Sequence, residues 1–171
     1  HLATLTFTTG AGVTDGAILN IDSSGFQSAI FGQMISSTVG DPIIPGGTGA
    51  APSIFVSNAN GIIVGPNAHI VAPTCIGLLG ANLNTTNRIN DFIANNNVVP
   101  ANPATPGASY INIAGTLSKV EIQGGSIDGD AIASTPAQYI LIAGSNVIND
   151  GILFAKDIRI SAGETAVVQK G

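Results

Sequence analysis

Short apolar runs rich in Ile, Val and Leu recur along the whole chain, and Gly, Pro, Asn or Asp bounds each of them. Runs of this length between turn residues predict short β-strands. The predicted strands are residues 3–8, 17–21, 53–56, 62–64, 69–71, 110–113, 120–122, 139–142 and 157–161. No amphipathic helical pattern continues beyond about two turns, and its best instance, residues 86–95, predicts at most a short helix or turn.

A loose pattern also repeats along the chain. Each copy begins with Gly, any residue and then an apolar residue. A few positions later it continues with two apolar residues that are separated by one residue. The pattern occurs in residues 115–122 and 151–160, and less clearly in 61–71. Uneven recurrence of this kind favours a parallel β-helix, in which inward aliphatic side chains stack from coil to coil and Gly and Asn form corners. A jelly roll or sandwich is the alternative. The Pro- and Gly-rich segments 41–52 and 95–107 are expected to be excursions from the core.

Composition narrows the fold class. The chain of 171 residues has 24 Ile, 22 Gly and 15 Asn, and 9% of its residues are charged, against roughly 25% in an average domain. The scarcity of Glu, Lys and Arg argues against a helical bundle. No apolar run approaches the roughly 18 residues of a membrane-spanning helix. We therefore expect one β-rich domain without a membrane span.

The net charge of the chain and its few Cys and His residues limit the classes of partner and site that we expect. The net charge is −5, and no Lys or Arg precedes Arg88, so we expect no nucleic acid and no anionic surface as partners of the N-terminal half. Cys75 is the only cysteine, which excludes a disulfide framework and predicts a buried hydrophobe. His69 is expected at the surface of a strand. The acidic, Ser-, Thr- and Asn-rich composition predicts an extracellular protein. The start at His1 then indicates a removed export signal, with a chain trimmed for another reason as the alternative.

Residues 54–68 read IFVSNANGIIVGPNA. This segment resembles the signature of the haemagglutination-activity domain, the N-terminal domain of filamentous-haemagglutinin-like, two-partner secretion proteins. The family signature is an apolar strand, then Asn-Pro-Asn-Gly followed by Ile or Val, then a short strand and Gly-Pro-x-Ala. Asn58, Asn60 and Gly61 match the signature and Ile62 follows them, whereas Ala59 stands where the family has Pro.

The resemblance covers roughly residues 17–165. Other similar segments are residues 28–34, 77–83 followed by Asp91 and Phe92, 139–144, 147–151 and 158–163. The resemblance implies an all-β fold, a single-stranded right-handed parallel β-helix (a β-solenoid) with small excursions. Residues 1–171 would then form one domain, with residues 1–16 as an N-terminal strand or cap and residues 166–171 as a C-terminal tail.

The motif residues have a structural and a recognition interpretation. Asn tolerates left-handed backbone conformations and Gly supplies a positive φ, so Asn58, Ala59, Asn60 and Gly61 predict a corner at which the chain changes direction before Ile62. The family resemblance implies instead that residues 58–62 contact an outer-membrane transporter during export.

Two aspartates are the remaining chemical candidates. Asp128 and Asp130 are one residue apart, so in a strand they share a face. With Lys156 and Arg159 they suggest acid/base chemistry on a polysaccharide, and alone they suggest a weak calcium site. The preferred interpretation is that residues 125–130 form a solvated turn. We accordingly expect no catalytic site and no cofactor.

Together these observations predict a non-catalytic adhesive or structural protein at the cell surface of a bacterium. A short β-helix has open ends whose unpaired backbone groups invite strand addition, and Leu2, Thr4, Thr6 and Thr8 form the candidate segment. The expected partners are other copies of the chain in a filament or layer, a transporter during export, and a host or neighbouring cell surface. A secretion-targeting domain of a larger adhesin is the alternative, and a polysaccharide-acting enzyme is the third class.

Overall fold

The computed structural model describes residues 3–8, 16–37, 51–83, 109–113, 117–129, 136–164 and 166–169. All regular elements within these ranges are strands, which are numbered β1 to β16 in chain order. None of the described segments forms a helix long and apolar enough to cross a membrane.

Three parallel sheets contain most of the strands, and each sheet is named here after its first strand. The β1 sheet consists of β1 (Thr4–Thr8), β4 (Gln33–Ser37), β7 (His69–Val71), β11 (Ser126–Asp128) and β14 (Ile152–Leu153). The β2 sheet consists of β2 (Ala17–Asp22), β5 (Ser53–Asn58), β8 (Cys75–Leu79), β12 (Ala137–Gly144) and β15 (Ala155–Ala162). The β3 sheet consists of β3 (Ser28–Ile30), β6 (Ile62–Val64), β10 (Val120–Ile122) and β13 (Val147–Asn149). A fourth, antiparallel sheet pairs β9 (Ser109–Ile113) with β16 (Ala166–Gln169).

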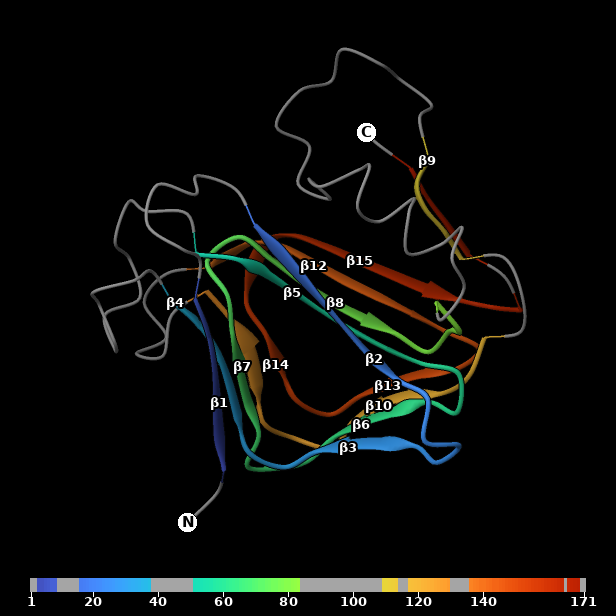
Figure 1. Cartoon of the computed structure of the whole chain (residues 1–171), viewed down its shortest axis with the longest axis horizontal. Coiled ribbons are helices and arrows are strands. Elements are labelled where there is room, and N and C mark those ends of the chain that lie inside the picture. Colours follow the sequence, from blue (N-terminus) through green and yellow to red (C-terminus); the bar gives the residue numbers. More distant parts are fainter. Residues whose placement is uncertain are drawn as a thin grey trace.

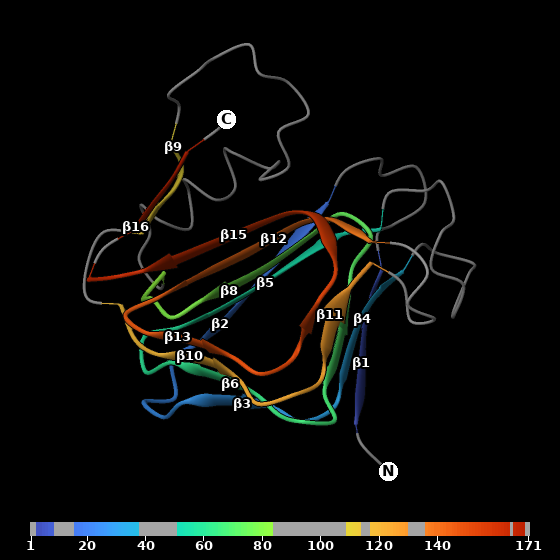
Figure 2. The same cartoon turned by 180° about the vertical axis from the view of Figure 1, so that it is seen from behind.

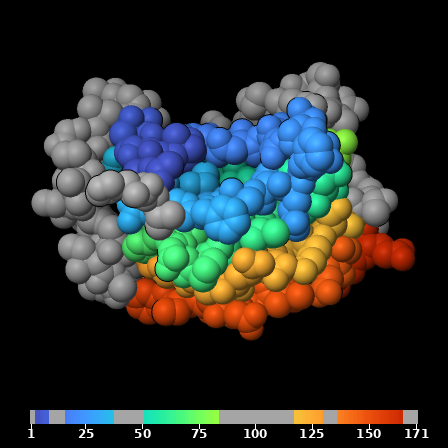
Figure 3. Space-filling view, turned by 90° about the horizontal axis from the view of Figure 1, so that it is seen from below, coloured from blue at the N-terminus to red at the C-terminus, as the bar shows by residue number. Residues whose placement is uncertain are grey.

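The chain visits the three parallel sheets in turn. For example, β5 lies in the β2 sheet, β6 in the β3 sheet and β7 in the β1 sheet, and β8 then returns to the β2 sheet. Figures 1 and 2 show the sheets as three sides around a common interior. Figure 3 shows the resulting layers, with N-terminal residues at one end of the stack and C-terminal residues at the other.

Columns of aliphatic side chains fill the interior. In the β2 sheet, Ile54 lies beside Ile76 and Ile76 lies beside Ile140. In the β3 sheet, Ile62 lies beside Val120. All five side chains are fully buried. Full burial of one such side chain stabilises a fold by roughly 1.5–3 kcal/mol, so these columns explain the high Ile content.

A second apolar cluster covers the outer face of the β2 sheet. It includes Phe55, Cys75, Leu79 and Tyr139. Cys75 is fully buried, as the sequence predicted, and burial raises the pKa of its thiol. The Phe55 ring lies over Gly77 on the neighbouring strand, where a Cβ atom would clash with the ring. Gly77 is therefore required by packing across the strand pair.

The observed topology corrects the expected fold class. The strands form a stack of three separate parallel sheets and an antiparallel pair, instead of the single-stranded right-handed parallel β-helix that the resemblance implied. The all-β class and the parallel pairing are confirmed. The number and identity of the sheets depend on which short run pairs with which, and that pairing is set by contacts between residues far apart in the chain.

Every strand predicted from the apolar runs is present. The apolar runs did not predict the other strands, namely β3, β4, β8, β11, β13, β14 and β16. Some expectations lie outside the described residues: the short helix or turn at 86–95, the excursion at 95–107, and residues 41–50 of the other excursion.

Candidate functional site: the two ends of the sheet stack

At each of the two ends of the stack, the last described strand of every parallel sheet has a neighbouring strand on one side only. Among the described strands, β1 pairs with β4 alone and β2 with β5 alone, so these two strands and β3 form the N-terminal end. In the same way β13, β14 and β15 form the C-terminal end. The free side of such an edge strand presents backbone N–H and C=O groups that can pair with a further strand.

Interior positions become exposed at the C-terminal end. Ile158 and Ile160 of β15 lie beside Ile140 and Ile142 of β12 in the register of the β2 sheet. Ile140 and Ile142 are 0% exposed, whereas Ile158 is 41% and Ile160 is 50% exposed. The same column of the core is thus covered on β12 and open on β15.

The N-terminal end is apolar as well. Leu5 on β1 is 51% exposed, and Phe31, which follows β3, is 52% exposed. Phe26, in the turn between β2 and β3, is 78% exposed. A hollow at this end is lined by residues 3–5 and 29–34. The two ends of the stack therefore both combine a free strand edge with exposed apolar side chains.

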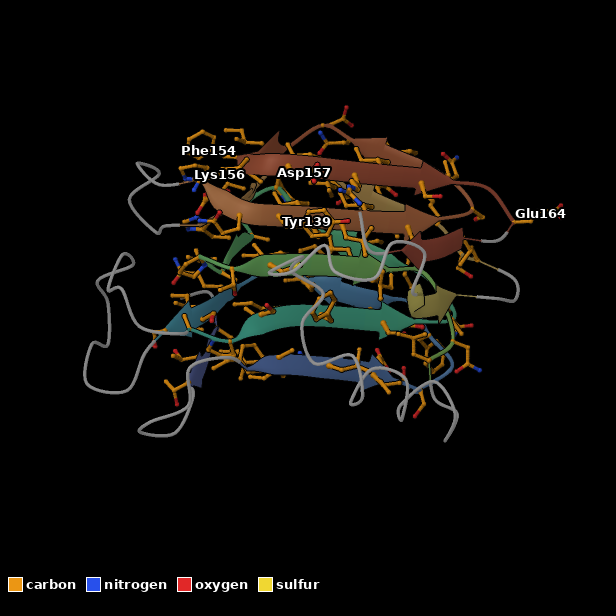
Figure 4. The ribbon with its side chains drawn as sticks, turned by 90° about the horizontal axis from the view of Figure 1, so that it is seen from above. Tyr139, Phe154, Lys156, Asp157 and Glu164 are labelled. Carbon is orange, nitrogen blue, oxygen red and sulfur yellow. The ribbon has the colours of Figure 1, made fainter. Side chains whose placement is uncertain are left out.

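Strand β15 carries three charged side chains, Lys156, Asp157 and Arg159. Figure 4 shows Phe154 and Lys156 at the start of β15 and Asp157 further along, next to Tyr139 of β12. Arg159 Nη2 donates a hydrogen bond to Asp157 Oδ2 at 3.0 Å, and its guanidinium carbon lies 5.2 Å from the centre of the Tyr139 ring. Burial raises the pKa of the Tyr139 hydroxyl.

The sequence-predicted strand-addition segment lies at the N-terminal end. Thr4, Thr6 and Thr8 belong to β1 and are exposed, and Leu2 lies outside the described residues. The register places Thr4 beside Gln33, and Thr4 Oγ1 donates a hydrogen bond to Gln33 Oε1 at 3.3 Å. Strand addition at this edge stays a prediction.

The motif residues form the turn between β5 and β6. Asn58 ends β5, Ala59 and Asn60 are exposed in the turn, and Ile62 begins β6. The Asn60 backbone N–H donates to Asn58 Oδ1 at 2.7 Å, and the Gly61 N–H donates to the Asn58 carbonyl at 3.2 Å. Gly61 has a φ of +101°, and a Cβ atom there would lie 2.6 Å from the Lys119 carbonyl oxygen. Glycine is therefore required at this turn.

The Asn58 side chain is fully buried and ties the turn to the preceding layer. Its amide nitrogen donates to the Phe26 carbonyl at 2.8 Å, to Ser28 Oγ at 2.7 Å and to Asp22 Oδ2 at 3.2 Å. In the folded chain a partner cannot reach this amide, so a transporter that reads Asn58 would have to meet the unfolded segment. Transporter recognition at residues 58–62 remains a prediction.

Asp22 completes this polar cluster. Ser28 Oγ donates to its carboxylate at 2.6 Å, and the Ser24 backbone N–H donates at 2.9 Å. These hydrogen bonds hold the pKa of the Asp22 carboxyl below its ordinary value, and the bond from Ser28 has the largest effect. The carboxylate is thus stabilised in its charged form.

Asp128 is not in a solvated turn, which corrects the interpretation of residues 125–130. It ends β11, and its side chain is 3% exposed. His69 Nε2 lies 2.9 Å from Asp128 Oδ2, within hydrogen-bond distance, so His69 is a half-buried partner of Asp128 rather than a plain surface residue. This pair was missed because the two residues lie far apart in the chain, and only the pairing of β7 with β11 brings them together.

The described residues do not assemble a cation site around these aspartates. No group of three or more His, Cys, Asp or Glu side chains suited to a metal ion occurs in the described parts of the chain. Asp130 lies outside them. Lys156 and Arg159 are on β15 of the β2 sheet, whereas Asp128 is on β11 of the β1 sheet. The proposed acid/base grouping is therefore split between two sheets.

Comparison with known proteins adds no further assignment. No protein-family model, no curated protein and no solved structure matches the chain. The resemblance to the haemagglutination-activity domain accordingly stays a prediction based on the motif residues.

Proposed function

We propose that the chain is a non-catalytic, exported structural or adhesive protein that self-associates through the two ends of its sheet stack. The observation that carries this proposal is the exposure of the core positions Ile158 and Ile160 on β15, at 41% and 50%. A solitary molecule would leave these side chains and the free edge of β15 in water.

Two physical terms favour association. Covering half of an isoleucine side chain is worth on the order of 1 kcal/mol, and several such side chains lie at each end. The edge strands also gain backbone hydrogen bonds, which is the way in which open sheet edges join. The low charge of the chain, 9% of its residues, reduces the repulsion between copies.

Export to the cell surface and attachment to a host or neighbouring cell belong to the same proposal. They are supported by the acidic composition and by the resemblance of residues 54–68 to a secreted family. A surface layer or filament of such copies would present the sides of the stack, with the turns between the sheets, to its surroundings.

Light scattering and negative-stain electron microscopy of Ile160→Lys test the proposal. A lysine at the open end of the core adds charge where another copy would pack, so we expect the large assemblies formed by the unmodified chain to disappear. Gln138→Lys is the matched control, because Gln138 is exposed on β12, inside the stack rather than at its end. The control should assemble normally. Assembly of Ile160→Lys at the level of the control would contradict the proposal.

A further inference from the structure

We propose that copies join head to tail, so that β15 of one molecule pairs in parallel with β2 of the next, and β14 pairs in parallel with β1. This inference rests on the proposed self-association and specifies its polarity and register. It follows from the columns that already run through the stack.

The β2 sheet gives the register of the join. Ile18, Ile54, Ile76, Ile140 and Ile158 occupy one column across its five strands. β2 and β15 are the opposite edges of this sheet, and all its strands are parallel. Ile18 of a second copy therefore fits beside Ile158 in the geometry that joins each neighbouring pair within the chain.

The β1 sheet repeats the relationship. Leu5, Met34, Ile70, Ile127 and Leu153 form one column from β1 to β14. Among the described strands, the β1 and β2 sheets have five each, so both reach the join together, whereas the β3 sheet has four and so has one described strand fewer there. Two of the three sheets thus continue through the interface without a change of direction.

Joins between like ends do not preserve these columns. Two identical ends are related by a two-fold axis, which cannot keep both the strand direction and the inward face of an edge strand against its own copy.

A heterologous contact of this kind does not close, and it produces an open filament. Each copy contributes five strands to the β2 sheet. At about 4.8 Å between strands, the axial repeat of the filament would be roughly 24 Å per copy.

Variants with one added cysteine test the polarity. Ile21 and Ser161 lie in one column of the β2 sheet, through Ser57, Leu79 and Ala143. In the proposed join Ile21 of one copy is beside Ser161 of another, at a spacing of about 4.8 Å that a disulfide can span. The native Cys75 is fully buried, and the unmodified chain serves as the control for any reaction of its thiol.

An equal mixture of Ile21→Cys and Ser161→Cys should form a mixed disulfide dimer on mild oxidation, and neither variant should cross-link alone. Cross-linking of Ser161→Cys with itself would overturn the head-to-tail join in favour of a like-end contact. Assembly of the mixture without cross-links would overturn the join while the proposed self-association stands. If light scattering showed that both the mixture and the unmodified chain stay monomeric, the head-to-tail join and the proposed self-association would both be overturned.

Discussion

Ile140 and Ile158 are neighbours in one column of the β2 sheet, yet Ile140 is fully buried and Ile158 is 41% exposed. Their backbone environments are the same in strand type and direction. They differ because β12 has a neighbouring strand on each side, whereas β15 pairs with β12 alone among the described strands. The column of core side chains is therefore exposed at β15, and this exposure is the basis of the proposed association.

Replacement of Gly77 by Ala should lower the free energy of unfolding by about 1–3 kcal/mol, because the new methyl group meets the ring of Phe55, which is fully buried and has no room to move. Gly65→Ala is the matched control. Its methyl group meets the ring of Phe31, which is 52% exposed and can turn into solvent. Urea unfolding should show a clearly smaller loss for Gly65→Ala. Equal losses would contradict this packing argument.

Removal of the Asn58 amide should destabilise the fold. Asn58→Ala leaves the Phe26 carbonyl and the Asn60 backbone N–H without the side-chain partners they have now, at a cost of about 1–3 kcal/mol. The comparable turn residue Asn149 accepts from the Gly151 N–H at 3.3 Å but is exposed, so Asn149→Ala should change stability by less than about 0.5 kcal/mol. Urea unfolding of both variants measures the difference, and an Asn58→Ala chain as stable as the unmodified one would refute it.

Asp22 should make the stability of the fold depend on pH in the acid range. Its pKa in the folded chain is lower than the ordinary value of 3.8, chiefly because of the hydrogen bond from Ser28. A depressed pKa stabilises the fold above that ordinary value, and the contribution is lost as the pH falls through the folded-state pKa. An NMR titration of the Asp22 carboxyl should give a midpoint below 3.8, and Ser28→Ala should raise it. An unchanged midpoint in Ser28→Ala would rule out this cause.

The pair formed by His69 and Asp128 should contribute to the stability of the β1 sheet. The side chain of Asp128 is 3% exposed, and the atoms of the pair are 2.9 Å apart, so we expect His69→Ala to destabilise the fold by about 1–3 kcal/mol. A double-mutant cycle with Asp128→Ala separates the pair from the other contacts of each residue. A coupling energy of about 1 kcal/mol or more is expected, and strictly additive losses would show that the pair contributes nothing.

Local features of the fold were predictable from the sequence. The run Val120–Ile122 reads as a strand and is β10, and Cys75 reads as a buried hydrophobe and is one. Both features depend on the local pattern alone. β8 was missed because Gly77 interrupts its apolar run, and the reason for that glycine is the ring of Phe55 on another strand.

The parts of the site that depend on distant residues were not predictable. Asp128 was expected in solvent because an isolated carboxylate is usually solvated, and its burial with His69 follows from strand pairing. The exposure of Ile158 and Ile160 is invisible in the apolar pattern for the same reason, since the pattern does not tell which strand is the last in a sheet. The prediction of a single β-helix was wrong for the same reason, because the local pattern does not tell which strand pairs with which.

Sedimentation velocity of the unmodified chain over a wide range of concentrations is the direct test of association through the ends of the stack. The exposed core of β15 and the free edges predict species much larger than the 17.0 kDa chain, in a proportion that rises with concentration. A single 17.0 kDa species at every concentration would contradict self-association and, with it, the proposed function.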